Sequence, residues 1–348
     1  MMIVTIHTPD TNLAIPIPDP DTGLPWGGGP TRLELHESAA HGADPAVSPD
    51  YIRHWQLESS WRHSGWARQR RACWLALRAA GVAQSRLDRY AQCGCGAWVM
   101  QDKHQPSRLR IAASYCRDRW CLPCGRTRAR IAAANLRSLV SDRPHRMITL
   151  TIRADDRCLA DRLDHLYDSY RRLRRSKLWR DSVTAAAAFC EPVWSARSRG
   201  WHVHMHIIAA GRYIPHQSLS DAWLVASRDS YIVDLRLLRG HDQALDYVCK
   251  YAAKPLTAET IADHDRLTEA VLALQGRRLI LTSGAWHGIR LSECTDDTDW
   301  VTISPLWRIL VDAERGDTYA ATVLADLLGG SSCLTMSIDH PSAHPPGG

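Results

Sequence analysis

The sequence predicts an α+β fold in which helices flank a central antiparallel sheet. Residues 146–254 alternate between strand-type and helix-type hydrophobic periods in the order β-α-β-β-α-β-α, which suits such a sheet. The composition of 45% hydrophobic and 23% charged residues is ordinary for a globular protein of 348 residues. No stretch approaches the roughly 18 apolar residues that suggest a transmembrane helix, and no secretory signal is visible. We therefore expect a cytoplasmic protein without a membrane partner.

Composition along the chain divides it into five regions. Residues 1–50 are rich in Pro, Asp and Gly and lack periodicity, which predicts a disordered arm. Residues 51–140 are expected to be helical and to include a cysteine-rich, zinc-knuckle segment. The sheet domain follows at 146–255, then a mostly helical region at 256–330 and a flexible tail at 331–348.

The elements of the sheet domain follow from their periodicity. Ile148, Leu150 and Ile152 alternate with Thr149 and Thr151, which predicts a strand over 146–153. The further predicted elements are a helix over 158–180, strands over 185–194 and 200–211 that form a hairpin, a helix over 216–228, a strand over 231–238, and a helix over 242–253 that Pro255 ends. The pattern near 278–290 is compatible with a short hairpin.

Three histidines lie at two-residue spacing in the strand over 200–211. Because successive side chains of a strand point to opposite faces, His202, His204 and His206 share one face, and the apolar residues between them share the other. Imidazoles side by side on a rigid strand suit a metal site. Glu191, on the paired strand, can add a carboxylate, and two His with one carboxylate leave positions open for substrate oxygens. The alternative is a half-buried strand whose histidines face water.

Five of the 11 cysteines lie between positions 93 and 124. Two close-set groups, Cys93-Gly-Cys95 and Cys116 to Cys124, are separated by about twenty residues, which is typical of structural zinc sites. Cys121 and Cys124 form the firmest pair, and Cys116 is the expected third ligand. Cys93 or Cys95 completes the site, or both do if Cys116 is not a ligand. The alternatives are separately buried cysteines or a redox pair.

Positive charge is concentrated around and after the cysteines. From Lys103 to Arg180 there are 20 Lys and Arg against 7 Asp, although the net charge of the chain is +6. Such a block favours a polyanionic partner such as nucleic acid, whereas a single Arg-rich helix is usually a solvated face. The candidate phosphate contacts near the cysteines are Arg117, Arg119, Arg126, Arg128 and Arg130.

Two tyrosines and two lysines repeat at four-residue spacing near the end of the sheet domain. Tyr247 and Tyr251 share one helical face, as do Lys250 and Lys254. A tyrosine hydroxyl, whose ordinary pKa is about 10, needs a nearby cation or a metal-polarised phosphate to act as a nucleophile. The alternative is an amphipathic helix whose tyrosines enter the core. Together with the histidine strand, this pattern indicates phosphoryl transfer.

These motifs, in this order, resemble those of the rolling-circle replication initiators of the HUH endonuclease superfamily. Ile148-Thr-Leu-Thr-Ile152 resembles their first motif, and Gly200-Trp-His-Val-His-Met-His206 resembles their His-hydrophobic-His motif. Tyr247-Val-Cys-Lys-Tyr251-Ala-Ala-Lys254 resembles the nucleophile motif. The segment from Cys116 to Cys124 is similar to a cysteine-rich stretch of many plasmid Rep proteins. The resemblance covers approximately residues 93–255.

The resemblance implies a fold, a reaction and partners. The HUH fold is a central antiparallel sheet that carries His204 and His206, with the tyrosine helix beside it. The reaction is site-specific nicking and joining of one strand at a plasmid replication origin, through a 5′-phosphotyrosine. The implied catalytic metal is Mg²⁺ or Mn²⁺, held by His204, His206 and Glu191, with His202 as a further ligand or as a partner of one. Zn²⁺ is structural. The partners are single-stranded or hairpin origin DNA and a host helicase, because no Walker-type loop is present.

One departure from the plasmid relatives concerns the second tyrosine. Some of them carry a Glu four residues before the nucleophile, where this chain has Tyr247. A tyrosine pair resembles instead the initiators of small single-stranded DNA phages and related transposases, in which one tyrosine holds the parent strand while the other cleaves. We expect Tyr251 to act first, because it follows Lys250 and matches the motif core. Tyr247 then acts second or is a packing residue.

Three other functions are compatible with the same residues. The first is a transposase or mobilisation relaxase with the same chemistry. The second is a non-catalytic zinc-dependent DNA-binding protein whose histidines are structural. The third is a metallohydrolase of small substrates, against which the basic block and the tyrosine helix argue.

Overall fold

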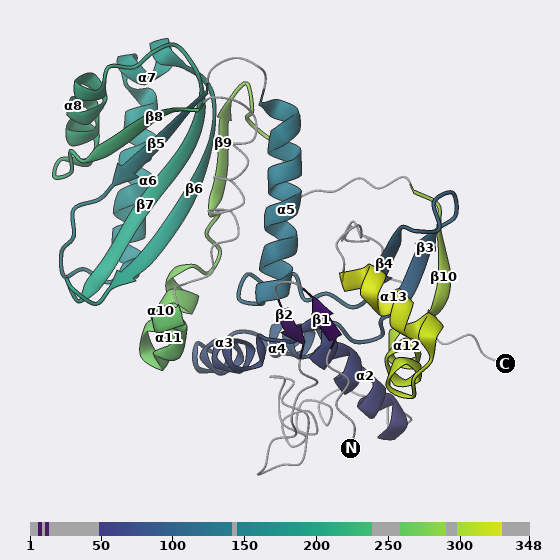
Figure 1. The fold of residues 1–348 in the computed structure, drawn as a ribbon. Helices are drawn as coiled ribbons and strands as arrows, with labels where there is room; N and C mark the ends of the chain where they lie inside the picture. Colours follow the sequence, from purple (N-terminus) through teal and green to yellow (C-terminus); the bar gives the residue numbers. More distant parts are fainter. Residues whose placement is uncertain are drawn as a thin grey trace. The chain divides into compact units, whose positions relative to one another are not determined.

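The computed structural model describes residues 6–8, 11–13, 49–140, 145–238, 258–289 and 298–328. The chain divides into two compact units, Met1–Thr127 with Cys294–Gly348, and Arg128–Glu293 (Figure 1). The predicted α+β class is confirmed, since the structure contains an antiparallel five-stranded sheet, flanking helices and a cysteine cluster in the N-terminal region. No helix among the described residues is long and apolar enough to cross a membrane.

The first unit contains helices and two small sheets. Its elements are β1 (Ile6–Thr8), β2 (Thr11–Leu13), α2 (Pro49–Arg62), α3 (Ala67–Ala79), α4 (Gln84–Ala91), β3 (Trp98–Asp102), β4 (Leu109–Ala112), β10 (Trp300–Pro305), α12 (Leu306–Glu314) and α13 (Thr318–Leu328). A three-stranded antiparallel sheet has the order β10-β3-β4. Its Val99 and Ile111 pack in one apolar cluster with Ile309 and Val323 of the last two helices. The sequence did not predict this sheet, and its third strand comes from the region expected to be mostly helical.

The second unit is built on the five-stranded sheet. Its elements are β5 (His145–Thr151), α6 (Leu159–Arg175), α7 (Lys177–Ser182), β6 (Val183–Ser195), β7 (Gly200–Gly211), α8 (His216–Ser227), β8 (Val233–Leu238), α10 (Ala258–Ala262), α11 (His264–Ala273) and β9 (Ile280–Gly284), preceded by most of α5 (Leu122–Leu139). The strand order is β8-β5-β7-β6-β9, and every pair is antiparallel.

Most elements of the sheet domain match their predicted ranges, with two differences. The four predicted strands correspond to β5, β6, β7 and β8 within two residues at each end. The expected helix over 158–180 is two helices, α6 and α7, because the backbone of Ser176 is extended. The Ser176 hydroxyl caps α7 by accepting a hydrogen bond from the amide of Trp179, in the first turn of that helix. Instead of a hairpin near 278–290, the described residues form one strand, β9, which adds to the edge of β6. The predicted helix over 242–253 lies outside the described residues.

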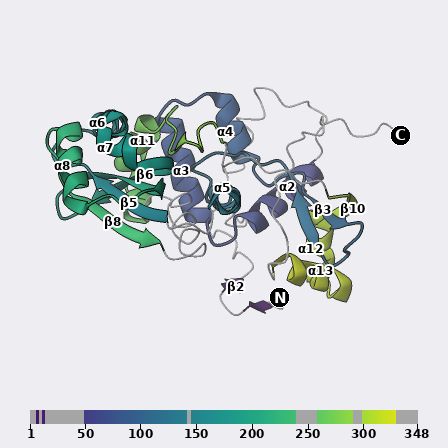
Figure 2. The ribbon, with the colours of Figure 1, turned by 90° about the horizontal axis from the view of Figure 1, so that it is seen from above.

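The two faces of the five-stranded sheet have different environments. On one face Ile148, Leu150 and Ile152 are fully buried, and α6 packs on this side (Figures 1 and 2). On the other face, one end is apolar, and there Leu136 of α5 packs in a cluster with Met147 and Ile208. The same face becomes polar further along β5 and β7, where the histidines lie. The fold therefore positions the histidine row on a sheet whose apolar face is packed.

Candidate functional site

The three histidines of β7 form a row on one face of the sheet. The ring centroids of His202 and His204 are 6.4 Å apart, and those of His204 and His206 are 6.0 Å apart. His206 is buried at 6% exposure, whereas His202 and His204 are half-buried. The intervening Val203 and Met205 are fully buried on the opposite face, so the strand cannot turn the histidines away without losing its core.

Two threonines of the neighbouring strand orient the last two histidines. The register places Thr149 opposite His206 and Thr151 opposite His204. The Thr149 Oγ1 atom lies 3.2 Å from Nδ1 of His206, and the Thr151 Oγ1 atom lies 3.1 Å from Nδ1 of His204. When each Nδ1 donates its proton to the hydroxyl oxygen, Nε2 carries the lone pair of the imidazole, which is the form that binds a metal ion.

Glu191 brings a carboxylate to the same place. Its register partner on β7 is His204, but its Oε2 atom lies 2.7 Å from Nε2 of His206. Both side chains are nearly buried, so a shared proton or a cation must balance the carboxylate charge. Two imidazoles and one carboxylate are a donor set that fits a divalent cation. Of the residues expected to bind the catalytic metal, the structure brings His206 and Glu191 into contact, and the ring centroid of His204 lies 6.0 Å from that of His206.

His202 occupies a different environment from the other two histidines. Its Nε2 atom lies 2.7 Å from the Ser198 hydroxyl, in the turn between β6 and β7. Burial lowers the pKa of His202, and the charge of Arg162 lowers it further. Its register partner is Val193, which has no ligand atom, so His202 lies beside the His-Glu cluster and bonds to the turn.

The predicted nucleophile helix over 242–253 is not among the described residues. Tyr247, Lys250, Tyr251 and Lys254 all lie outside the described residues. Their roles therefore rest on the sequence motif.

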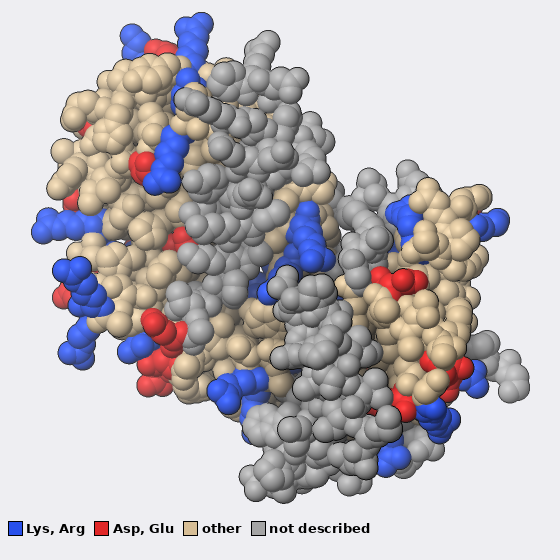
Figure 3. All heavy atoms as spheres, in the orientation of Figure 1, with Lys and Arg blue, Asp and Glu red and all other residues tan. Residues whose placement is uncertain are grey.

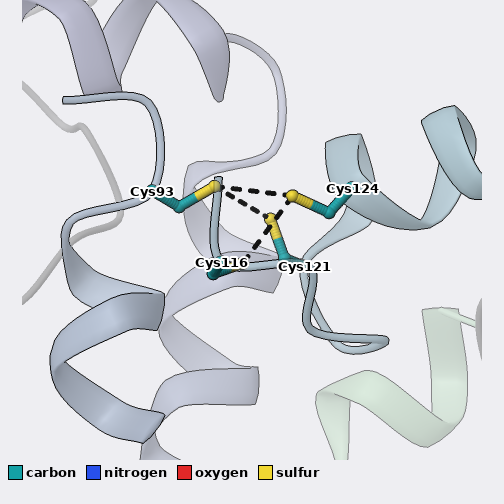
Figure 4. A group of neighbouring side chains, drawn as sticks. All are labelled: Cys93, Cys116, Cys121 and Cys124. Atoms are coloured by element: carbon teal, nitrogen blue, oxygen red, sulfur yellow. Dashed lines mark hydrogen bonds between the residues drawn. The ribbon is translucent and has the colours of Figure 1, made fainter. Parts of the chain in front are cut away.

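Four cysteines converge in the first unit (Figure 4). The Sγ atom of Cys93 lies 3.7 Å from that of Cys121 and 3.6 Å from that of Cys124, and Cys116 lies 3.7 Å from Cys124. A tetrahedral zinc with Zn–S bonds of about 2.3 Å requires sulfur–sulfur distances of about 3.8 Å. The four thiols are thus spaced to hold a metal ion such as zinc. Cys95 lies outside the group, since its thiol points to the carbonyl of Trp55.

Donor groups surround the four sulfurs. The Arg62 guanidinium lies 3.7 Å from Sγ of Cys124, and the Asp118 amide donates to Sγ of Cys116 at 3.4 Å. The His63 Nε2 atom lies 3.5 Å from Sγ of Cys121. Hydrogen bonds from Cys116 lower the pKa of Cys93, and they lower the pKa of Cys124 to about 7. These hydrogen bonds favour the thiolate, the form that binds zinc, at Cys93 and Cys124, whereas the pKa of Cys116 and that of Cys121 are raised within the same cluster. Sequence reasoning missed Arg62, the last residue of α2, and His63, which follows it, because they precede Cys93 by about 30 residues in the chain.

The candidate phosphate-binding arginines lie beside the cysteine cluster and along α5. Arg117, Arg126 and Arg130 are exposed, whereas Arg119 and Arg128 are half-buried. The Arg126 guanidinium lies 4.3 Å from the centre of the Trp66 ring, which holds the charge at the surface. Basic side chains are visible over α5 in Figure 3. This surface is suited to contacts with a phosphate backbone.

The comparison with protein families identifies the chain. A family model described as a replication protein matches residues 108–305, which is more than half of the 348 residues. The chain belongs to this replication protein family. No match was found among curated proteins or among solved structures. Membership supports a role of this replication protein as a plasmid replication initiator, and a replication initiator binds DNA. The matched range includes the histidine row, Glu191 and three of the four clustered cysteines; Cys93 lies before it.

Thr149 and Thr151, which contact His206 and His204, were indicated by the sequence only as one face of a strand. Their two-residue spacing equals that of the histidines, so an antiparallel pairing in register aligns the two rows. The matching spacing of the threonines and the histidines is visible in the sequence, but the strand register that places Thr149 opposite His206 is not.

Proposed function

We propose that this replication protein initiates rolling-circle replication by nicking one strand of a plasmid origin and later rejoining it. The support is the contact of Glu191 with His206 at 2.7 Å, beside His204 on the same strand face, with threonine hydroxyls at Nδ1 of both imidazoles. Non-catalytic histidines on a sheet face do not need a buried carboxylate 2.7 Å from an imidazole nitrogen.

In the proposed reaction Tyr251 is the first nucleophile. Its hydroxyl oxygen attacks the phosphorus of the scissile phosphodiester, the bond to the 3′ oxygen breaks, and that oxygen leaves as a 3′-OH after taking up a proton. The products are a 5′-phosphotyrosine and a free 3′-OH that can prime synthesis. We assign to Lys250 and Lys254 the positive charge that favours the ionised form of the tyrosine. Attack of a 3′-OH on the phosphotyrosine reverses the step and joins DNA ends.

The metal-binding role is assigned to His204, His206 and Glu191. A bound Mg²⁺ or Mn²⁺ would act as a Lewis acid and orient the scissile phosphate. Glu191 supplies the hard oxygen ligand that these ions prefer, and Thr149 and Thr151 hold the imidazoles in one tautomer. His202 is assigned a positioning role through Ser198, at the end of the row.

The cysteine site and the neighbouring arginines are proposed to bind the origin. Zinc held by Cys93, Cys116, Cys121 and Cys124 fixes the start of α5, and the arginines of this region contact phosphates: Arg117, Arg119, Arg126, Arg128 and Arg130. We also propose that a host helicase separates the strands after the nick.

Separate assays of cleavage and binding test the proposal. We expect His204→Ala and His206→Ala to lose Mn²⁺-dependent cleavage of single-stranded origin DNA but to keep DNA binding. His202→Ala, on the same strand and face, should reduce cleavage less than either, because His202 bonds to Ser198 in the turn. Unchanged cleavage in His206→Ala would remove the metal assignment. DNA binding without cleavage by the wild type on any origin strand would favour the non-catalytic zinc-dependent binding protein.

A further inference from the structure

Strand β8 is an exposed edge of the five-stranded sheet. Among the described residues its ladder partner is β5, at one side (Figures 1 and 2). Large apolar side chains at this edge are exposed: Tyr231 by 62%, Ile232 by 59% and Leu237 by 52%. Sheet edges are usually protected by charged side chains, Pro, a bulge or a covering helix. β8, with the sequence Val-Asp-Leu-Arg-Leu-Leu and a regular register, has no Pro and no bulge, and its two charged side chains have opposite signs. His216 of α8 contacts the edge at Val233, the first residue of the strand. Such an edge can accept another strand.

One hydrogen bond shows which backbone N–H and C=O groups of β8 point away from β5. The Thr151 amide donates to the Ile232 carbonyl at 3.3 Å, so residue 232 directs its backbone groups toward β5. In an antiparallel ladder alternate residues bond to the same neighbour. The backbone groups of Asp234 and Arg236 therefore also face β5, and Val233, Leu235 and Leu237 direct their N–H and C=O groups away from the sheet. The outward carbonyl of Val233 accepts a hydrogen bond from Nε2 of His216 on α8 at 3.1 Å.

The charges of β8 are complementary to those of an identical strand. Asp234 and Arg236 lie symmetrically on either side of Leu235 and form an ion pair with each other at 2.7 Å. An antiparallel second copy centred on Leu235 places each Asp234 directly opposite Arg236 of the other copy. In the same register the N–H and C=O groups of Leu235 meet those of the second copy's Leu235, and the Val233 N–H meets the carbonyl of the second copy's Leu237. The Val233 carbonyl keeps its hydrogen bond to His216. Charge pattern and backbone pattern thus select the same register.

We propose that a second copy of this chain pairs antiparallel with β8 and forms a symmetric dimer with one continuous sheet. Residues directly opposite each other point to the same face, and the register links Asp234 to Thr149 and Thr149 to His206. The histidine rows of both copies therefore open on the same side of the joined sheet. Five strand spacings separate them, which amounts to about 24 Å. If the proposed nicking function holds, the dimer presents two nicking sites to one DNA molecule.

A charge-reversal experiment on the full chain tests the dimer and its register. Sedimentation across the micromolar range should show a monomer–dimer equilibrium for the wild type. Asp234→Arg alone places like charges opposite each other at two symmetric positions, and so does Arg236→Asp. Each should weaken self-association by about tenfold or more. Mixed together, the two variants should associate again, because each chain then faces opposite charges. Asp168→Arg, an equally exposed charge on α6, should not change association.

Two results would overturn the dimer. One is a wild type that stays monomeric throughout. The other is a dimer that neither single reversal weakens, or that the mixture does not restore, which would place the interface elsewhere. Circular dichroism and a thermal melt of each variant show that a lost dimer is not a lost fold. The experiment requires no DNA and no metal, so its outcome is independent of whether the chain nicks DNA.

Discussion

Replacing Thr149 by Val tests whether the threonine row orients the metal-binding histidines. Valine keeps the shape and the β-branching of threonine but removes the hydroxyl that lies 3.2 Å from Nδ1 of His206. One such hydrogen bond contributes about 1.4 kcal/mol at most, which is about tenfold in affinity. Loss of a group that orients a metal-bound histidine typically weakens binding by about 10- to 100-fold. We therefore expect Mn²⁺ to bind about tenfold more weakly.

The measurement is Mn²⁺ titration by calorimetry, together with the Mn²⁺ dependence of nicking. The maximal rate at saturating Mn²⁺ should change little, since the ligands remain. Thr151→Val should behave similarly through His204, at 3.1 Å. Thr184→Val is the matched control, because its exposed hydroxyl bonds to the Ala210 carbonyl of the same sheet. Equal Mn²⁺ affinity of Thr149→Val, Thr184→Val and the wild type would refute the orienting role and the metal site built on it.

Three further predictions concern other parts of the chain. Cys124→Ser should abolish stoichiometric zinc binding and destabilise the first unit, whereas Cys95→Ser should retain zinc. Metal analysis and thermal melts measure both effects. Equal zinc loss in the two variants would contradict the four-cysteine site. Burial raises the pKa of Glu58 from 4.5 to about 7. The free energy of unfolding of the wild type, compared with that of Glu58→Gln, should therefore fall as the pH rises from 4.5 to 7. The total loss above pH 7 should be up to about 3 kcal/mol. Urea melts at pH 5 and pH 8 test this, and a difference independent of pH would exclude it. Tyr247→Phe should still nick origin DNA but should fail to release circular product, and loss of the first nick would reverse the order of the tyrosines.

The sheet of the second unit could be predicted because its strands are long and patterned. The alternation of Ile148 and Leu150 with threonines, and of histidines with Val203 and Met205, gives each strand one apolar face that only a packed sheet can use. The hairpin of β6 and β7 was predicted because its strands flank a short turn. The three-stranded sheet was not, since β3 and β4 have 5 and 4 residues and their partner β10 lies near the other end of the chain.

The candidate sites depended on contacts that spacing alone does not determine. The sequence left Cys93 and Cys95 as alternatives, because both are separated from Cys121 by nearly the same length. The structure turns Cys93 toward the cluster through Gly94, whose φ of +93° is a conformation that favours glycine. Similarly, Glu191 was placed on the correct strand, but the diagonal contact with His206 follows from its side-chain conformation.

Mapping of the covalent DNA adduct is the most direct test of the central claim that a tyrosine of this chain nicks DNA beside the His204–His206–Glu191 site. Wild-type protein is incubated with Mn²⁺ and single-stranded origin DNA, and the adduct is digested with trypsin and a nuclease. Trypsin cleaves after Lys250, so Tyr247 and Tyr251 fall in different peptides and mass spectrometry distinguishes them. We expect a phosphonucleotide on Tyr251 that is absent without Mn²⁺. An adduct that forms equally in His206→Ala, or no adduct on any origin strand, would contradict it.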